Sequence, residues 1–330
     1  MKLRAKITGV GHYVPAKVLT NHDLEKMVDT SDEWITSRTG IKERRILEDG
    51  KGSSYMGVFA AKRALEEAGV APEEVEMIIV TTVTPDMMFP NTACLIQEKI
   101  GAKNAWGVDV NGACTGFIYA ISIASQFIET GKYEKILVIG TDKMSSITDY
   151  TDRNTCILFG DAAGAVVLEP SEDPEYGILD FILKSDGSGG KYLYMKGGGS
   201  LYPPSHETVD KKMHYIYQDG RTVFKFAVAG MADISEEIVK KNNILPEQIK
   251  LFIPHQANQR IVDATARRLN LPSEKVLLNI SKYGNTTTAT IPLGLSEAYQ
   301  EGRLEKGDIV LFSAFGAGFT WGSLLLRWAI

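Results

Sequence analysis

Cysteines are few in this chain of 330 residues, and long hydrophobic segments are missing. The three cysteines, Cys94, Cys114 and Cys156, have no paired spacing, which argues against a disulfide framework and favours a reducing compartment. No apolar run approaches the ~20 residues needed to span a bilayer. The apolar stretch at residues 7–10 is too short for the core of a secretory signal. The sequence therefore predicts a cytoplasmic protein without a membrane partner.

Basic residues are fewer than acidic ones. The 36 Lys and Arg residues stand against 41 Asp and Glu, a net charge of −5, so the chain has no general attraction for nucleic acid. The five histidines show no metal-ligand spacing. Gly197-Gly198-Gly199 lacks the spacing and the Lys-Ser/Thr ending of a phosphate-binding loop. We therefore expect no metal, no cofactor and no nucleic-acid partner.

Helical patterns alternate with short, continuously apolar strand patterns. This alternation is typical of α/β layers with buried strands. We expect strands at 3–10, 77–82, 106–110, 136–140, 251–253 and 309–314, and helices at 31–38, 54–67 and 117–128, the last of these ended by Gly131. Because the run 117–128 is apolar on nearly every side, it predicts a buried helix.

A weak internal duplication runs through the chain. Residues 64–79 align without gaps on residues 238–253, and both segments read as a helix, a proline turn and a buried strand. Further on, the segment from Gly112 to Gly131 agrees in length with that from Gly284 to Gly302 to within a residue. Such a period is far longer than that of a solenoid. We therefore expect two similar halves, residues 1–172 and 173–330, packed as one body.

Cys114 falls between the strand 106–110 and the start of the buried helix. Unpaired N–H groups and the positive end of the helix dipole lie at such a position, and they lower the pKa of a cysteine. We therefore expect a thiolate at neutral pH, although a lone cysteine is more often a packing residue.

Two polar residues of the second half fall at comparable positions. The duplication makes Gly284-Asn285-Thr286 the counterpart of the helix start that carries Cys114, and His255 follows the strand 251–253. If a pseudo-twofold axis relates the halves, all three side chains face one cleft. A thiolate beside an imidazole is an arrangement for covalent acyl transfer.

Five segments, in this order, resemble the ketoacyl-ACP synthase III family, where ACP is acyl carrier protein. They are DVNGACTGF at 109–117, FGDAAGA at 159–165, PHQAN at 254–258, YGNT at 283–286 and FGAGFTWG at 315–322. The resemblance implies the thiolase fold, a five-layered α-β-α-β-α body built from two similar halves. It also implies a catalytic triad of Cys114, His255 and Asn285. A second histidine in place of the asparagine would instead suggest the elongating condensing enzymes.

The resemblance also implies a reaction, the first condensation of type II fatty-acid synthesis. Cys114 takes an acetyl group from acetyl-CoA, and malonyl-ACP then loses CO2 to give an enolate that attacks the acetyl carbon. The products are acetoacetyl-ACP, CO2 and CoA. His255 and Asn285 would each donate one hydrogen bond to the developing oxyanion. The backbone N–H groups of Cys114, Gly316 and Ala317 would form a second oxyanion hole, with Ala317 standing where the family often has glycine.

Substrate contacts follow from the same resemblance. Contacts with CoA are implied for Trp34, Arg38, Arg153, Phe224 and Asn258. Phe89 is implied to enter the acyl pocket of the partner in a homodimer. An ACP-binding surface is implied for Lys225, Gln256, Ala257, Asn258, Gln259, Arg260, Arg267 and Arg268.

Other functions remain open from the residues. A long-chain acyl-CoA condenser or a secondary-metabolite ketosynthase would share the triad and differ in pocket size and acceptor. A papain-type Cys/His/Asn hydrolase would release free acid. A non-catalytic binding module on the same scaffold would lack a reactive Cys114.

Overall fold

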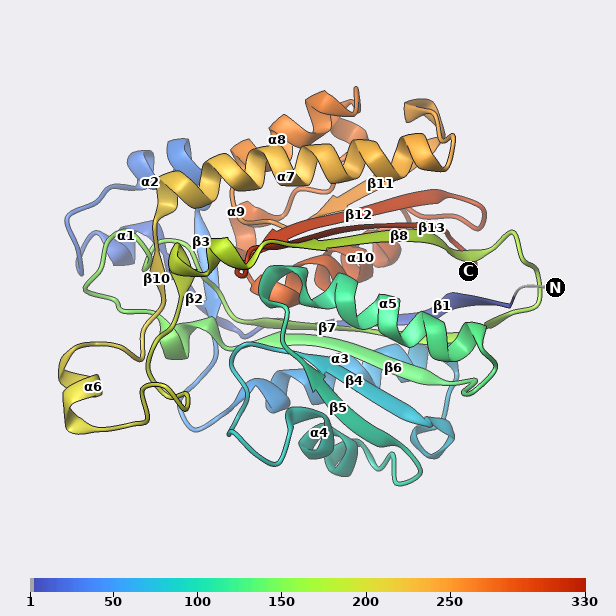
Figure 1. Ribbon diagram of the computed structural model, residues 1–330, viewed down its shortest axis with the longest axis horizontal. Helices are drawn as coiled ribbons and strands as arrows, with labels where there is room; N and C mark the ends of the chain where they lie inside the picture. The colour runs from blue at the N-terminus through green and yellow to red at the C-terminus, as the bar shows by residue number, and fades with distance from the viewer. Residues whose placement is uncertain (1–2) are drawn as a thin grey trace.

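Two large β-sheets form the framework of the protein, which the computed structural model describes over residues 3–330 (Figure 1). The strands of the first sheet are β1 (Arg4–Tyr13), β4 (Met77–Thr81), β5 (Trp106–Val110), β6 (Ile136–Asp142) and β7 (Ala162–Ser171). Those of the second are β8 (Gly177–Ser185), β11 (Ile249–Pro254), β12 (Ile309–Gly316) and β13 (Thr320–Arg327). The strand orders are β1-β7-β6-β4-β5 and β11-β12-β13-β8. In the first sheet β4, β5 and β6 are parallel, whereas β7 is antiparallel to both of its neighbours.

Helices lie between the two sheets and on both outer faces (Figure 1). The central layer holds α5 (Gly116–Glu129) and α10 (Thr290–Gln300). The outer face of the first sheet is covered by α3 (Ser53–Ala68) and α4 (Thr92–Ile100), and that of the second by α7 (Gly220–Lys241) and α8 (Gln259–Arg268). The layers therefore follow the order α-β-α-β-α, which confirms the predicted thiolase fold.

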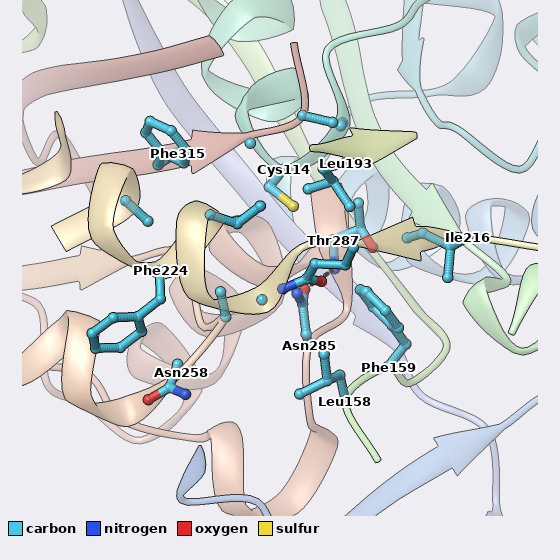
Figure 2. Close-up of a pocket in the computed structure, with 18 of the residues that line it drawn as sticks. Cys114, Leu158, Phe159, Leu193, Ile216, Phe224, Asn258, Asn285, Thr287 and Phe315 are labelled. Atoms are coloured by element: carbon cyan, nitrogen blue, oxygen red, sulfur yellow. Dashed lines mark hydrogen bonds between the residues drawn. The ribbon is translucent and has the colours of Figure 1, made fainter. Parts of the chain in front are cut away.

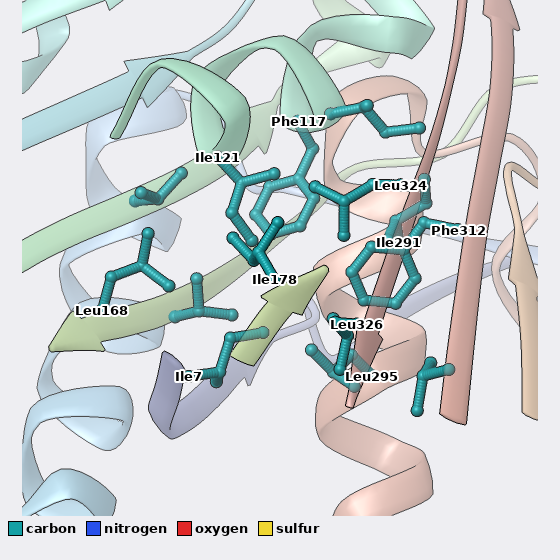
Figure 3. Close-up of a cluster of buried hydrophobic side chains, with 14 of the residues drawn as sticks. Ile7, Phe117, Ile121, Leu168, Ile178, Ile291, Leu295, Phe312, Leu324 and Leu326 are labelled. Atoms are coloured by element: carbon teal, nitrogen blue, oxygen red, sulfur yellow. The ribbon is translucent and has the colours of Figure 1, made fainter. Parts of the chain in front are cut away.

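The largest hydrophobic core surrounds the central helices (Figure 3). Phe117 and Ile121 of α5 lie close to Ile291 of α10 and to Phe312 and Leu324 of the second sheet. A helix that packs against a sheet on each side needs apolar residues all round, which explains the composition of α5. The expected buried helix is thus confirmed, with Gly131 at φ 69° just beyond its end.

The two parts of the duplication have the same order of elements. A 3-10 turn, η1 (Pro72–Glu74), follows α3 and leads into β4, and η5 (Pro246–Gln248) follows α7 and leads into β11. The chain passes from the first sheet to the second between β7 and β8. This crossing adjoins the expected boundary at residues 172 and 173.

Smaller elements gather at one end of the layers (Figure 1). They are β2 (Lys17–Thr20), α1 (Asn21–Leu24), α2 (Asp32–Thr39), β3 (Glu43–Ile46), β9 (Leu193–Tyr194), α6 (His206–Asp210), β10 (Tyr217–Gln218) and α9 (Ile280–Tyr283). The α2 helix lies one residue later than the helix predicted at 31–38, because Ser31 caps it by accepting a hydrogen bond from the Trp34 N–H (3.1 Å) and Gly40 ends it with φ 83°. In residues 3–330 no helix is long and apolar enough to cross a membrane.

Candidate active site

A cavity of about 780 Å³ is lined by residues from both parts of the duplication (Figure 2). Cys114, His255 and Asn285 all line it, although they come from the start of α5, the end of β11 and the segment before α10. The structure therefore brings the three predicted side chains to one cavity.

A strained turn presents Cys114. It is the second residue of a 3-10 turn, η2 (Ala113–Thr115), that precedes α5, and Ala113 before it has φ 45°. The N–H groups of a first helical turn have no partner within the helix. A left-handed conformation at a residue other than glycine costs energy and is common near functional groups. The turn thus places Cys114 at the wall of the cavity, while the N–H groups of Thr115 and Gly116 donate within the turn to the carbonyls of Gly112 (3.0 Å) and Ala113.

The thiol is not ionised in this environment, contrary to the sequence-based expectation. Burial raises the pKa of Cys114 to about 12, and the negative charge of Asp142 adds to the increase. A hydrogen bond from its own backbone N–H acts in the opposite direction but is the smallest of these effects. The expected thiolate at neutral pH is therefore wrong for the free enzyme, because desolvation outweighs the helix start.

His255 is held rigidly by its backbone and has no partner for its ring. Its N–H donates to the Ser313 carbonyl (2.8 Å), and the residue is 2% exposed. Neither ring nitrogen has a hydrogen-bond partner among residues 3–330. Burial lowers the pKa of His255 to about 3, so the imidazole is neutral at physiological pH. A buried polar group without a partner is rare and needs an explanation, and a bound ligand would supply the missing partner.

Three hydrogen bonds hold Asn285 in place. Its N–H donates to the Leu158 carbonyl (2.8 Å), and its carbonyl accepts from the Gly160 N–H (3.0 Å). Its side-chain Oδ1 accepts from the Thr287 N–H (2.9 Å). Because Oδ1 is occupied in this way, the Nδ2 group remains as the free donor of this amide.

The residue of the second segment that corresponds to Cys114 differs from the predicted one. The positive-φ residue of the second helix start is Thr287 (φ 51°), the first residue of η7 (Thr287–Ala289), just as Ala113 is the first residue of η2. Cys114 therefore corresponds to Thr288, and the proposed counterpart Gly284-Asn285-Thr286 is wrong by two residues. Gly116 lets the two helix starts approach closely, since a Cβ there would lie 2.0 Å from Thr81 Oγ1 and 3.0 Å from Thr288 Oγ1.

Gly316 keeps the space beside the nucleophile open. It ends β12, and a Cβ at this position would lie 2.9 Å from the Cys114 nitrogen and 3.1 Å from the Cys114 Cβ. An acceptor oxygen lies 2.7–3.2 Å from a donor nitrogen, so the missing side chain leaves room for such an oxygen. Ala317 also lines the cavity.

The predicted CoA residues lie around the same cavity. Trp34, Arg38, Phe224 and Asn258 line it. The Arg38 and Arg153 guanidinium groups lie 5.6 and 4.8 Å from the centre of the Trp34 ring. The Asn258 Nδ2 group donates to the Arg38 carbonyl (3.0 Å), which joins α8 to α2.

The predicted ACP-binding residues divide into two groups. Lys225, Arg260, Arg267 and Arg268 are exposed on α7 and α8, whereas Ala257, Asn258 and Gln259 are partly buried. Gln256 is buried completely, and its Nε2 donates to the carbonyls of Pro254 (3.1 Å) and Leu277 (3.0 Å). The expectation that Gln256 belongs to a docking surface is therefore wrong for its side chain, which is committed to the interior.

Phe89 lies apart from the cavity of its own chain. Its side chain is 85% exposed, and the neighbouring Met87 and Met88 are exposed too. Phe89 is not among the described residues that line the cavity. An apolar loop of this kind is suited to contact another molecule.

Two residues, one that lines the cavity and one buried beside Cys114, were not predicted. Thr287 lines it, and its buried Oγ1 has no hydrogen-bond partner among residues 3–330. Asp142 is buried beside Cys114, where its Oδ1 accepts from the Thr82 hydroxyl (2.9 Å) and from the N–H and hydroxyl groups of Thr84 (3.1 and 2.8 Å). The available signal was position, since Asp142 lies two residues beyond the strand predicted at 136–140 and Thr287 lies two residues beyond Asn285.

Comparisons with known proteins identify the family. The models for 3-oxoacyl-[acyl-carrier-protein (ACP)] synthase III and for its C-terminal part match residues 108–187 and 239–328. A beta-ketoacyl-[acyl-carrier-protein] synthase III from Koribacter versatilis is 57% identical over 99% of this chain and 98% of the relative. The crystal structure of 3-oxoacyl-[acyl-carrier-protein] synthase III from Aquifex aeolicus has a TM-score of 0.91 and 48% identity, covering 98% of this chain and 100% of the other. The priming beta-ketosynthase of the R1128 polyketide pathway has a TM-score of 0.91 and 35% identity, covering 98% and 96%.

These relatives and the layered fold define a condensing enzyme of the thiolase fold, an acyltransferase. The chain belongs to the 3-oxoacyl-[acyl-carrier-protein] synthase III family.

Proposed function

We propose that this enzyme carries out the initiating condensation of type II fatty-acid synthesis. An acetyl group passes from acetyl-CoA to Cys114, and malonyl-ACP then takes it over with loss of CO2 to give acetoacetyl-ACP. The observation that carries the proposal is the convergence of Cys114, His255 and Asn285 on one cavity between the two helix starts. We propose further that residues 1–172 and 173–330 are the two similar halves of the enzyme.

In the first step Cys114 becomes acetylated. The Cys114 sulfur attacks the thioester carbon while His255 takes the thiol proton, and CoA leaves as its thiol with that proton. Because the thiol pKa is high and the imidazole is neutral, proton transfer accompanies formation of the C–S bond. The negative oxygen of the intermediate accepts hydrogen bonds from the N–H groups of Cys114 and of the Gly316-Ala317 segment.

In the second step the acetyl group is transferred, a reaction that we call discharge. Malonyl-ACP loses CO2, and the electron pair of the broken C–C bond gives a thioester enolate. The enolate carbon attacks the acetyl carbon, and the Cys114 sulfur leaves with the electron pair of the C–S bond and takes a proton from water to restore the thiol. His255 and the Asn285 Nδ2 group donate to the enolate oxygen, for which a neutral imidazole is suited because one ring nitrogen carries a proton. Decarboxylation itself generates the carbanion, so the chemistry needs no cofactor.

The proposal extends to substrates and partners, and the resemblance to the family supports the residue assignments. Trp34, Arg38 and Arg153 bind the adenine nucleotide of CoA, and Phe224 and Asn258 contact its pantetheine arm. The acidic carrier protein docks on Lys225, Arg260, Arg267 and Arg268, beside Ala257, Asn258 and Gln259. The enzyme acts as a homodimer in the cytosol, and the exposed Phe89 of one subunit closes the acyl pocket of the other.

A second candidate is a priming ketosynthase of polyketide synthesis. The 35% identity and TM-score of 0.91 to the R1128 enzyme favour this alternative over the hydrolase. The two candidates differ in the acyl group that they accept from CoA.

The test is a product assay with purified enzyme, malonyl-ACP and a series of acyl-CoA primers. Mass spectrometry of the carrier protein follows the product, with Cys114→Ala as the control. We expect acetoacetyl-ACP from acetyl-CoA with the wild type and none with the variant. Turnover of longer primers but not of acetyl-CoA would favour the priming ketosynthase, and release of free acetate without condensation would contradict both.

A further inference from the structure

Arg44 is a fully buried guanidinium whose place the reaction does not explain. It lies on β3, is 0% exposed and remains protonated at neutral pH, since burial lowers its pKa only to about 10. Its three hydrogen bonds all go to neutral oxygen atoms, which are the Leu19 carbonyl (3.2 Å), the Asn21 Oδ1 (2.9 Å) and the Ile157 carbonyl (2.6 Å). An arginine buried without a carboxylate is costly, which suggests a constraint beyond packing.

The hydrogen bond to the Ile157 carbonyl attaches the Arg44 guanidinium to the segment 157–160, which in turn holds Asn285. Leu158 and Gly160 in this segment form the two backbone hydrogen bonds to Asn285 (2.8 and 3.0 Å). Phe159 and Asn285 form a parallel β-bridge between these bonds. Any shift of the Ile157 carbonyl would therefore move the backbone to which Asn285 is attached.

Two glycines bring the arginine close to both strands of this bridge. A Cβ at Gly160 would lie 3.0 Å from the Arg44 Cβ, and a Cβ at Gly284 would lie 3.4 Å from it. The stem of Arg44 thus packs against the backbone on each side of Asn285, while its head holds Ile157. Lysine could not replace it fully, because a single ammonium lacks the planar fork that reaches oxygens in different directions.

We infer that Arg44 is a positioning residue that fixes the Asn285 amide for the decarboxylative step. This inference rests on the proposed function, in which the Asn285 Nδ2 group donates to the enolate oxygen. Arg44 does not line the cavity, and its bond to Ile157 and its packing against Gly160 and Gly284 link it to the backbone around Asn285. Its loss should therefore slow discharge, which uses Asn285, more than the acetylation of Cys114.

The experiment measures the two half-reactions separately in single turnovers of the full-length enzyme. Acetylation is followed by intact mass after mixing with acetyl-CoA, and discharge by mixing the acetylated enzyme with malonyl-ACP. Arg44→Met should slow discharge on the order of 10-fold to 100-fold, as expected for a misplaced catalytic group, and change acetylation by less than about threefold. Arg44→Lys should slow discharge by a smaller factor. This variant replaces Arg44→Met in the test if the Met variant does not fold.

Arg4 offers a matched control, because its Nη1 also donates to two backbone carbonyls, those of Ile178 (2.9 Å) and Leu179 (3.2 Å), and it does not line the cavity. Arg4→Lys should leave both half-reactions unchanged. A double-mutant cycle completes the test: in the Asn285→Ala background, Arg44→Met should slow discharge no further than about twofold.

The outcomes separate the inference from the function on which it rests. Equal loss in both half-reactions, or losses that add fully in the double variant, would overturn the role of Arg44. Unchanged discharge in Asn285→Ala alone would instead overturn the proposed role of Asn285.

Discussion

The Gly316→Ala variant tests the oxyanion hole at the nucleophile. The added methyl would lie 2.9 Å from the Cys114 nitrogen and 3.1 Å from the Thr115 nitrogen, both of them backbone atoms. A carbon at that distance occupies the place of an oxygen that accepts from the Cys114 N–H. The φ angle at Gly316 is not positive, so the substitution adds no left-handed strain. The methyl therefore acts by contact with the turn that carries Cys114, by occupying the oxygen's place and by displacing the backbone donors.

The expected loss follows from the donor that is blocked. Removing one oxyanion donor costs on the order of 10²–10³ in rate, so we expect acetylation of Cys114 by acetyl-CoA to slow by about that factor. The rate is measured by intact mass spectrometry in single turnovers, and thermal unfolding reports whether the variant remains folded.

Gly187→Ala is the matched control for Gly316→Ala. A Cβ at Gly187 meets no atom within 4 Å, and the residue is exposed. This variant should acetylate at the wild-type rate. If folded Gly316→Ala did so as well, the assignment of the Cys114 N–H as an oxyanion donor would be refuted.

Three further predictions concern the cavity and the docking surface. Asn285→Asp keeps the acceptor for the Thr287 N–H but loses the Nδ2 donor, so discharge should slow on the order of 10²–10³-fold; discharge near the wild-type rate would show that the donor is dispensable. Because the Cys114 pKa is raised to about 12, its alkylation by iodoacetamide in the free enzyme should rise about tenfold per pH unit from pH 7 to 9; a plateau below pH 9, followed on the Cys114 peptide, would contradict the raised pKa. Arg268 already pairs with Glu236 (3.0 Å), so Arg260→Ala should raise the KM for malonyl-ACP more than Arg268→Ala does, and less so at high salt; equal effects would argue against this division of the surface.

Local sequence patterns predicted the elements that carry the site. The strand Trp106–Val110 has the predicted bounds, and the buried helix after it begins one residue before the predicted run. Both succeeded because a buried strand and a helix between two sheets leave strong apolar patterns. These patterns place Cys114 and His255 beside such elements, whereas the triad as a set came from the family resemblance.

The environment of those residues could not be predicted in the same way. The raised pKa of Cys114 depends on burial and on Asp142, which is distant in sequence. The register error arose because Ala113 and Thr287 adopt positive φ without being glycine or asparagine, so no sequence signal marks the turn. Gln256 was misplaced because burial of a polar side chain depends on partners such as the Leu277 carbonyl, which only the fold supplies.

The most direct test of the account is intact-protein mass spectrometry after mixing the purified enzyme with acetyl-CoA, with Cys114→Ala alongside. We predict an acetyl adduct on the wild type alone, and its disappearance when malonyl-ACP is added, with formation of acetoacetyl-ACP. An adduct that forms only with a longer or branched acyl-CoA would keep the mechanism but overturn the primer. No adduct with any acyl-CoA would contradict Cys114 as the acyl carrier and the condensing reaction built on it.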